Sequence, residues 1–237
     1  MLLELSAPPG SGKTAVARRL FLRGYLPANA SHHDPLWGKV FVAGCILEGM
    51  WVFRDACVGR RAFTRGACSR DALSRSLRTL SLAGLSRRAA RSANRFVLDQ
   101  GPFGLGSGLP LDDATIGRQL SELQNRRYRP RVVIFFRLPE SLILEKRRRR
   151  GDWQEYEEKA RRLGFATAEE RLTYQYRMLP SLLTVCRTLR IGYAVLSADF
   201  KGQIAGVDGW CNPHLPTGKS ELDNVVQDAL DCWAPGA

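Results

Sequence analysis

Residues 7–14 read APPGSGKT, a stretch whose residue types could hold the phosphates of a nucleotide. A glycine-rich loop of this kind turns its main-chain N–H groups inward onto phosphate oxygens, and the N-terminus of a following helix adds positive potential. Lysine reaches the β- and γ-phosphates, and the next hydroxyl binds Mg²⁺. The residues predicted to bind ATP or GTP are Pro9, Gly10, Ser11, Gly12, Lys13 and Thr14, and Thr14 is also a predicted Mg²⁺ ligand.

The stretch departs from the pattern G-x-x-x-x-G-K-[ST] at its first position, where Ala7 stands in place of glycine. That position lies where the chain leaves a strand, and alanine adds only a methyl group there. We therefore expect nucleotide binding to be retained. The alternative is a decayed loop in a protein that no longer transfers or hydrolyses phosphate.

Two aspartates are candidates for the acidic group of the site. Asp99 ends the apolar run RFVLD, residues 95–99, and would either hold Mg²⁺ through water or accept the proton of a phosphate acceptor. Asp34, in HDPLW, is the rival general base, and its alternative role is an ordinary Asp-Pro turn. A carboxylate close to a hydroxyl orients it even at an unshifted pKa, so both candidates stay open.

A basic cluster, EKRRRRG at residues 145–151, is the third group that could do chemistry. Lys146, Arg147 and Arg150 are expected to close over a transferring phosphate, because a guanidinium stays charged and binds two oxygens at once. Consecutive arginines point in different directions around a helix, so only one or two can face the site. We interpret residues 146–166 as a lid that excludes water. The alternative is a solvated helix.

Apolar runs and helical patterns alternate along the chain and must position these residues. We expect strands at 2–6, 95–99, 131–138 and 191–199, and helices at 13–23, 42–53, 60–95, 112–127, 139–150, 172–186 and 220–232. This alternation predicts an α/β fold with a mostly parallel sheet and helices on both faces. Ligands of such sheets bind beyond the carboxyl ends of the strands, where the loop and Asp99 would meet.

Charge and composition bound the remaining possibilities. The chain has 237 residues, a net charge of +13 and no Gly/Ser linker, which favours a single domain over 1–237. Residues 60–95 hold ten arginines and one aspartate, and we interpret 25–95 as a basic helical insert on the acceptor side. An anionic partner such as a nucleotide, nucleic acid or acidic lipid would explain that charge, as would a solvated arginine-rich face.

The cysteines and the apolar runs indicate a reducing, aqueous setting. None of the six cysteines forms a C-x-x-C pair, and none has zinc-ligand spacing with the three histidines. No run of apolar residues is long enough to span a membrane. The chain opens directly on an apolar run without the features of a secretory signal. A cytoplasmic location is therefore expected.

Several motifs resemble the P-loop nucleoside and nucleotide kinases, the branch of thymidylate kinases and deoxynucleoside kinases. FVLDQGP is similar to the strand that ends in an acid in those families, and FFRLPESLILEKRRRRGD is similar to their strand, Pro-Glu helix start and entry to the lid. HDPLW is similar to their E-P-x-x-W, with the tryptophan one residue early. The resemblance covers most of the chain and is weak between residues 25 and 94. Gln100 stands where those families have arginine.

The resemblance implies a three-layer P-loop NTPase fold with a helical lid. It also implies an ATP-dependent phosphotransferase that acts on a small molecule, such as a nucleoside or nucleotide. An antibiotic or natural-product phosphotransferase is a second reading within the same class. A nucleic-acid-linked ATPase, a polynucleotide end kinase and a regulatory module with little turnover are the readings outside it. A homodimer is also open, since dimers are frequent among the related kinases.

Overall fold

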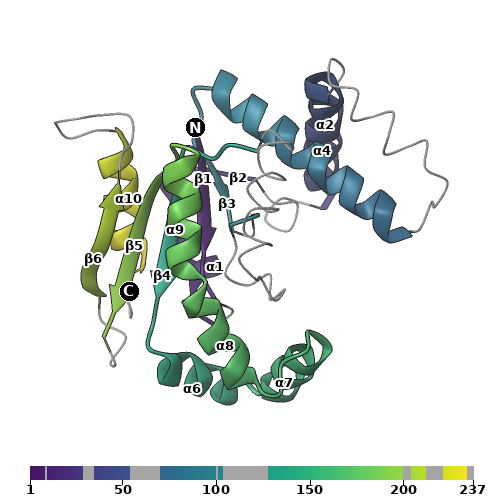
Figure 1. The fold of residues 1–237 in the computed structure, drawn as a ribbon. Helices are drawn as coiled ribbons and strands as arrows, with labels where there is room; N and C mark the ends of the chain where they lie inside the picture. The colour runs from purple at the N-terminus through teal and green to yellow at the C-terminus, as the bar shows by residue number, and fades with distance from the viewer. Residues whose placement is uncertain are drawn as a thin grey trace.

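The computed structural model describes residues 1–8, 10–28, 35–53, 70–99, 101–103, 128–199, 204–211 and 221–233 (Figure 1). The strands are β1 (Leu2–Ser6), β2 (Leu26–Pro27), β3 (Phe96–Leu98), β4 (Val132–Arg137), β5 (Gly192–Ala198) and β6 (Ile204–Cys211). The helices are α1 (Lys13–Leu22), α2 (Pro35–Phe53), α4 (Arg70–Arg91), α6 (Glu140–Arg150), α7 (Trp153–Arg162), α8 (Ala168–Arg177), α9 (Leu179–Thr188) and α10 (Glu221–Trp233).

The six strands form one sheet in the order β2-β3-β1-β4-β5-β6. The first five are parallel, and β6 pairs antiparallel to β5. In the centre, Leu3 of β1 lies opposite Val97 of β3 on one side and Val132 of β4 on the other. Because β1 is flanked by β3 and β4, the segments that follow these three strands emerge side by side at one edge of the sheet.

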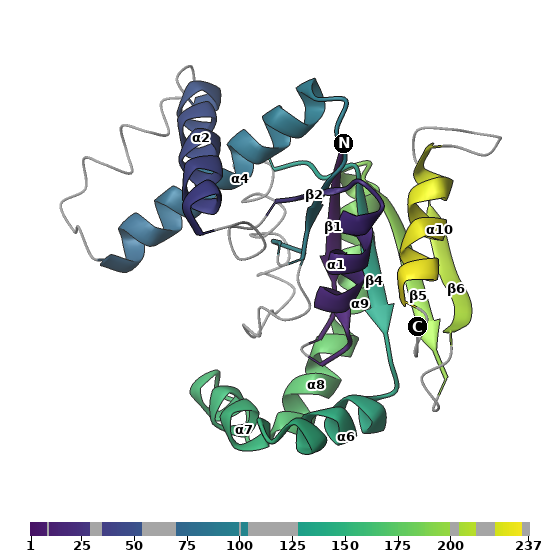
Figure 2. The same cartoon turned by 180° about the vertical axis from the view of Figure 1, so that it is seen from behind.

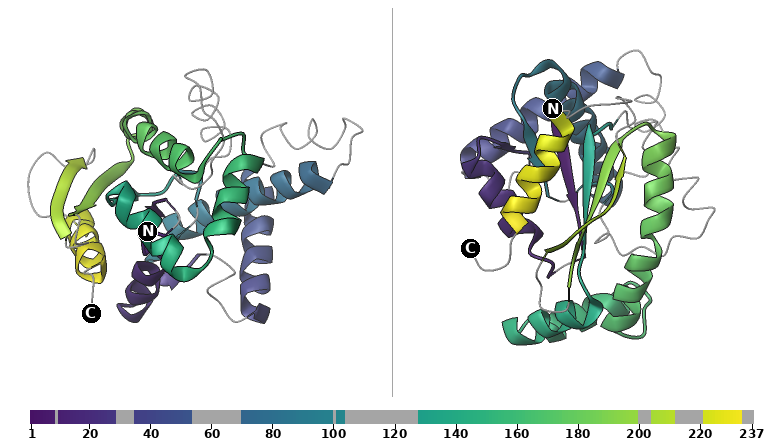
Figure 3. Two further views of the ribbon diagram at one scale, coloured as in Figure 1. Left: turned by 90° about the horizontal axis from the view of Figure 1, so that it is seen from below. Right: turned by 90° about the vertical axis from the view of Figure 1, so that its left-hand side faces the viewer.

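Helices cover both faces of the sheet, which is why the central strands are apolar on both sides (Figures 2 and 3). Successive side chains of a strand point to opposite faces. Leu3 and Leu5 therefore pack in the core with α1 and α10, whereas Leu2 packs in the core with α4 and α9. Along β4, the same alternation places Ile134 in the core with α1 and α10 and Phe135 in the core with α4 and α9.

Helices α2 and α4 cross in direct backbone contact beside the sheet (Figure 1). Two glycines permit this approach. A Cβ atom on Gly49 would overlap the main-chain oxygen of Leu80, and one on Gly84 would overlap that of Cys45. The insert expected at 25–95 thus contains a tightly packed helix pair.

The expected α/β architecture, a mostly parallel sheet with helices on both faces and further helices at the carboxyl edge, is confirmed. Several details differ from the expected elements, and the short strand β2 was not among them. Helix α2 begins at Pro35 instead of residue 42, the expected helix at 172–186 is divided into α8 and α9 at Met178, and β6 was not expected. The helix expected at 112–127 lies outside the described residues. In the described part of the chain, no helix has both the length and the apolarity that crossing a membrane requires.

Candidate active site

The loop after β1 contains two glycines in a backbone conformation that favours glycine. Gly10 and Gly12 have φ angles of 97° and 85°, in the region that side chains disfavour, and Gly12 caps the N-terminus of α1. The main-chain oxygen of Ser11 accepts a hydrogen bond from the Trp233 indole at 3.3 Å, which ties the loop to α10. The buried Ser11 hydroxyl has no hydrogen-bond partner among the described residues. This leaves a polar group inside the loop for a ligand to engage.

Ala7 fits its place at the start of the loop without strain. Its side chain is buried and belongs to the core formed by β1, α1 and α10. In the described chain, Arg190 is the one residue other than glycine with a positive φ, so Ala7 keeps an ordinary backbone conformation. The departure from glycine at this position therefore adds a packed methyl group and leaves the loop geometry intact.

Lys13, Thr14 and Asp99 come together at the edge of the sheet, although 85 residues separate Thr14 from Asp99. The Lys13 ammonium donates to the main-chain oxygen of Asp99, and the Thr14 hydroxyl donates to Asp99 Oδ2 at 3.4 Å. Asp99 is almost fully buried. Burial lowers the pKa of Lys13, and the charges of Asp99 and Glu4 oppose that shift.

Glu4 is a site residue that sequence reasoning missed. It lies in the middle of β1, is fully buried, and accepts hydrogen bonds from the Phe103 main-chain N–H and the Tyr128 hydroxyl, both at 2.7 Å. Burial, followed by the nearby Glu4 charge, raises the pKa of Tyr128 well above its ordinary value. Glu4 thereby holds the segment that follows Asp99. The signal was a single acid within the otherwise apolar run LLELS.

Arg147 of α6 lies directly over the phosphate loop. A Cβ atom on Gly10 would stand 3.2 Å from Arg147 Nε, so only glycine leaves this contact uncrowded. Arg147 also pairs with Asp152 and stacks over the Tyr156 ring at 4.8 Å from its centroid. Its Nε has no hydrogen-bond partner within the described ranges. Helix α6 thus places a partly buried guanidinium beside Gly10 of the loop.

A cluster of buried polar side chains extends from Arg147 to residues of α7 and α8. Arg171 is fully buried, and its guanidinium lies 5.1 Å from the centroid of the Tyr156 ring, on which Arg147 also stacks. Burial lowers the pKa of Arg171, and the Arg147 charge acts in the same direction. Neither amide atom of the buried Gln175 has a hydrogen-bond partner in the part that the structure describes. Sequence reasoning missed Arg171 and Gln175, because apolar spacing alone marks neither.

The other predicted site residues are Lys146, Arg150, Pro9 and Asp34. Lys146 is partly buried, and burial together with the nearby Arg150 charge lowers its pKa. Arg150 is exposed at the end of α6. Pro9 and Asp34 lie outside the described residues, as does Gln100. The structure therefore brings Lys13 and Thr14 to Asp99 and sets Arg147 beside Gly10, and the roles of all the predicted site residues stay predictions.

The donor set at Thr14 and Asp99 fits Mg²⁺. No group of three or more His, Cys, Asp or Glu side chains that could hold a metal occurs in the ranges described. Mg²⁺ does not need such a cage, because it keeps several waters and binds through one or two carboxylates plus substrate phosphates. One hydroxyl and one buried carboxylate beside a phosphate loop match that requirement.

The solved structures to which the chain is similar include three of different activity. Deoxyadenosine kinase from M. mycoides with bound dATP is 12% identical, with a TM-score of 0.43 over 85% of this chain and 94% of that one. Shikimate kinase from Acinetobacter baumannii in complex with shikimate is 16% identical, with a TM-score of 0.40 over 97% and 90%. The tunicamycin resistance protein of Deinococcus radiodurans is 14% identical, with a TM-score of 0.36 over 80% and 95%.

No protein-family model and no curated protein sequence matches the chain. A parallel strand leads into a glycine loop that opens a helix, and an acid ends the neighbouring strand. The fold is a three-layer phosphate-loop fold. The predicted P-loop NTPase fold class is confirmed.

Proposed function

We propose that this protein is an ATP-dependent phosphotransferase that acts on a hydroxyl or phosphate group of a small molecule, with a nucleoside or nucleotide as the favoured acceptor. One arrangement carries the proposal. Lys13 and Thr14 of the loop contact Asp99 at the end of the adjacent strand, and Arg147 lies above Gly10. This supplies nucleotide contacts, an acid and a closing cation in one place.

Phosphoryl transfer depends on charge neutralisation and in-line placement more than on covalent chemistry. The loop N–H groups and Lys13 would hold the β- and γ-phosphates, and Arg147 would approach from the lid side. Thr14 and Asp99 would hold Mg²⁺, which supplies positive charge at the phosphates when bound. Arg171, buried behind Tyr156, adds positive potential to the same region.

The general base is assigned to Asp99 or Asp34. Asp99 is buried within hydrogen-bond reach of Thr14 and next to the loop, which supports its action on either the metal or the acceptor proton. If Asp99 is committed to Mg²⁺, Asp34 is the base. The measurement that separates them is the pair of variants Asp99→Asn and Asp34→Asn, assayed for both nucleotide affinity and transfer.

The acceptor is expected to carry negative charge, because the chain carries a net charge of +13 and α4 is rich in arginine. An antibiotic or natural-product acceptor is the alternative within the same class. A polynucleotide 5′ end is the alternative outside it, favoured by the net charge alone. We assign the reaction to the cytoplasm, where the buried free thiols Cys45, Cys186 and Cys232 would stay reduced.

We also propose a homodimer through the outer face of α2. Leu36, Val40, Leu47 and Met50 are exposed by 69%, 54%, 63% and 54%, and with Ala43 they repeat at spacings of four and three residues. Such a repeat is the seam of paired helices. An antiparallel copy centred on Ala43 would set Leu36 against Met50 of the partner subunit.

The function is tested with purified protein, Mg²⁺ and γ-labelled ATP. The acceptor panel holds nucleosides, nucleoside monophosphates, hydroxyl-bearing antibiotics and a 5′-hydroxyl oligonucleotide. We expect label on one class of small molecule, and loss of that label with Lys13→Ala. Label released only as free phosphate would replace the kinase with an ATPase. Tight ATP binding without any turnover would replace it with a regulatory module.

A further inference from the structure

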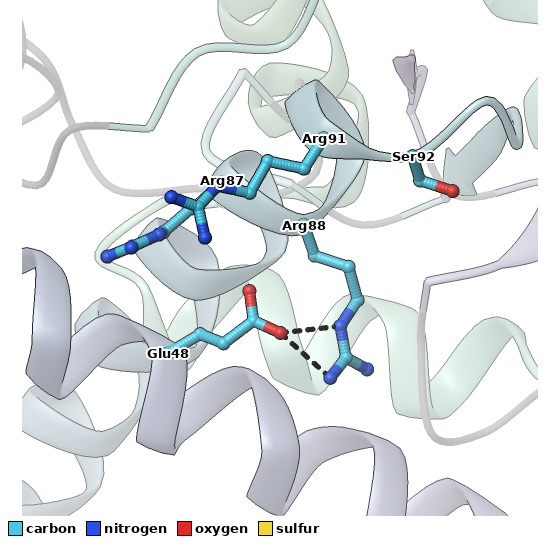
Figure 4. Close-up of a pocket in the computed structure, with 5 residues that line it drawn as sticks. All are labelled: Glu48, Arg87, Arg88, Arg91 and Ser92. Carbon is cyan, nitrogen blue, oxygen red and sulfur yellow. Dashed lines mark hydrogen bonds and ion pairs between the residues drawn. The ribbon is translucent and has the colours of Figure 1, made fainter.

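A pocket of about 650 Å³ lies between α2 and α4, and its lining is dominated by arginine (Figure 4). Its lining residues are Glu48, Arg87, Arg88, Arg91 and Ser92. The volume falls within the range of roughly 300–1,000 Å³ that holds small organic ligands. Three cations and one acid make the lining strongly positive.

The one acidic residue of the lining, Glu48, already forms an ion pair with Arg88. Glu48 Oε1 accepts from Arg88 Nε at 2.9 Å and pairs with Arg88 Nη2 at 2.9 Å. Arg88 also stacks over the Phe41 ring and lies close to Gly44, so packing fixes its position. The Glu48–Arg88 pair is therefore a neutral, structured wall of the pocket. Two positive charges, on Arg87 and Arg91, are left over.

Arg87 and Arg91 are four residues apart on α4, and so occupy the same side of the helix (Figure 4). Like charges at this spacing destabilise a helix. In the part of the chain that the structure describes, no ion pair joins either arginine to an acid. The lid arginines differ, because Arg148 pairs with Glu169 and Arg162 with Glu158. The arginines of the pocket thus lack the counter-charge that Arg148 and Arg162 possess.

The pocket is remote from the candidate active site. The C-terminal end of α4 precedes β3, so the pocket lies toward the amino ends of the parallel strands. The phosphate loop and the lid helices lie at the carboxyl ends, on the far side of the molecule (Figure 1). A ligand in this pocket would not be the nucleotide or the acceptor of the proposed reaction.

We propose that this pocket is a second anion site, which takes the phosphate group of a phosphate monoester. The dianion would match the two positive charges of Arg87 and Arg91, whose guanidinium groups can each bind two phosphate oxygens. The Ser92 hydroxyl, at the rim, accepts from the Asn94 N–H at 3.0 Å and still has a proton to donate. The monoester could belong to a free metabolite or to the 5′ end of a nucleic acid.

The test titrates glucose 6-phosphate into the full-length protein by calorimetry, with the phosphate loop saturated by Mg²⁺ and ADP. The test variant is Arg87→Ala/Arg91→Ala. The matched control is Arg18→Ala/Arg177→Ala, which removes the same charge from exposed positions on α1 and α8. We expect one saturable site in the wild type. Loss of two charged contacts should weaken the binding of glucose 6-phosphate about tenfold or more in the test variant. The control variant should weaken it by less than about twofold.

Three results would overturn the proposal. They are the absence of saturable binding to the wild type, an equal loss in both double variants, and equal binding of glucose itself. A parallel titration compares 5′-phosphorylated and 5′-hydroxyl oligonucleotides. Preference for the phosphorylated end that depends on Arg87 and Arg91 identifies nucleic acid as the source, and equal binding of the two ends, with glucose 6-phosphate still bound at the site, identifies a free metabolite.

Discussion

The Thr14 hydroxyl donates to Asp99 Oδ2 at 3.4 Å, and this contact joins the first turn of α1 to the end of β3. Thr14 follows β1 through the glycine loop, and Asp99 directly follows β3. These two strands are parallel neighbours in the sheet. The contact therefore follows from the register of two strands. It sets a hydroxyl and a carboxylate 3.4 Å apart beside the glycine loop.

Asp99→Asn should separate nucleotide binding from transfer. The loop N–H groups and Lys13 remain, so ATP affinity should change by less than about threefold, whereas turnover should fall at least about a hundredfold, as when a positioned acid or base is lost. Equilibrium binding of ATP and transfer from γ-labelled ATP measure the two effects. Asp231→Asn, an exposed carboxylate paired with Arg23, is the control and should change neither. Undiminished turnover in Asp99→Asn would move the base to Asp34.

ATP binding should weaken as the pH rises toward the ordinary lysine value of 10.5. Burial lowers the pKa of Lys13, so the free protein loses this cation below 10.5, and bound phosphates favour the protonated form. Binding on the alkaline side should therefore take up a proton. Calorimetry in two buffers of different ionisation enthalpy measures that uptake. Lys13→Arg keeps its charge in this range and should show none. A wild type without proton uptake would contradict the assignment.

Local patterns were sufficient for the loop and the central strands. The runs LLELS and VVIFFR are apolar enough to be buried on both faces, and GSGKT between a strand and a helix specifies its own backbone shape. Asp99 was predictable because parallel strands end at one edge of the sheet. These features depend on residues that are close in sequence or on the rules of parallel sheets.

Features that depend on distant contacts were not predictable. Strand β6, IAGVDGWC, contains glycines and an aspartate that weaken a strand pattern, and it forms by pairing with β5. The role of Glu4 depends on Tyr128, which is 124 residues away. The division between α8 and α9 at Met178 interrupts the single helix expected at 172–186.

Glu4→Ala should destabilise the protein by about 3 kcal/mol, because it leaves two buried donors, the Phe103 N–H and the Tyr128 hydroxyl, without their acceptor. Tyr128→Phe, which removes one of the two bonds, should cost less. Urea unfolding measures both. The control is Glu145→Ala, which removes an exposed acid paired with Arg149 and should change the free energy of unfolding by less than about 1 kcal/mol. If Glu4→Ala were as stable as this control, Glu4 would not hold the segment after Asp99.

Arg147→Ala should lower kcat/KM for transfer by about ten- to a hundredfold, the effect of one lost charge-assisted contact to phosphate. The guanidinium lies over Gly10 and is only 15% exposed. Arg149→Ala is the matched control from the same helix, since Arg149 is 78% exposed and pairs with Glu145. Its activity should stay within about twofold of the wild type, because exposed pairs contribute little. Equal effects of the two variants would mean that Arg147 does not belong to the site and that only the net charge of α6 affects activity.

Leu47→Glu should convert a dimer into a monomer. The outer face of α2 exposes Leu36, Val40 and Leu47 in a repeat that a second copy of α2 would bury, and a charge within that seam would be desolvated on association. Sedimentation equilibrium should give twice the 26.5 kDa chain mass for the wild type and the single mass for the variant. Leu22→Glu, at an 88% exposed position on α1, is the control and should stay dimeric. A wild-type protein that sediments at 26.5 kDa at every concentration would refute the α2 seam, whatever the outcome of the transfer assay.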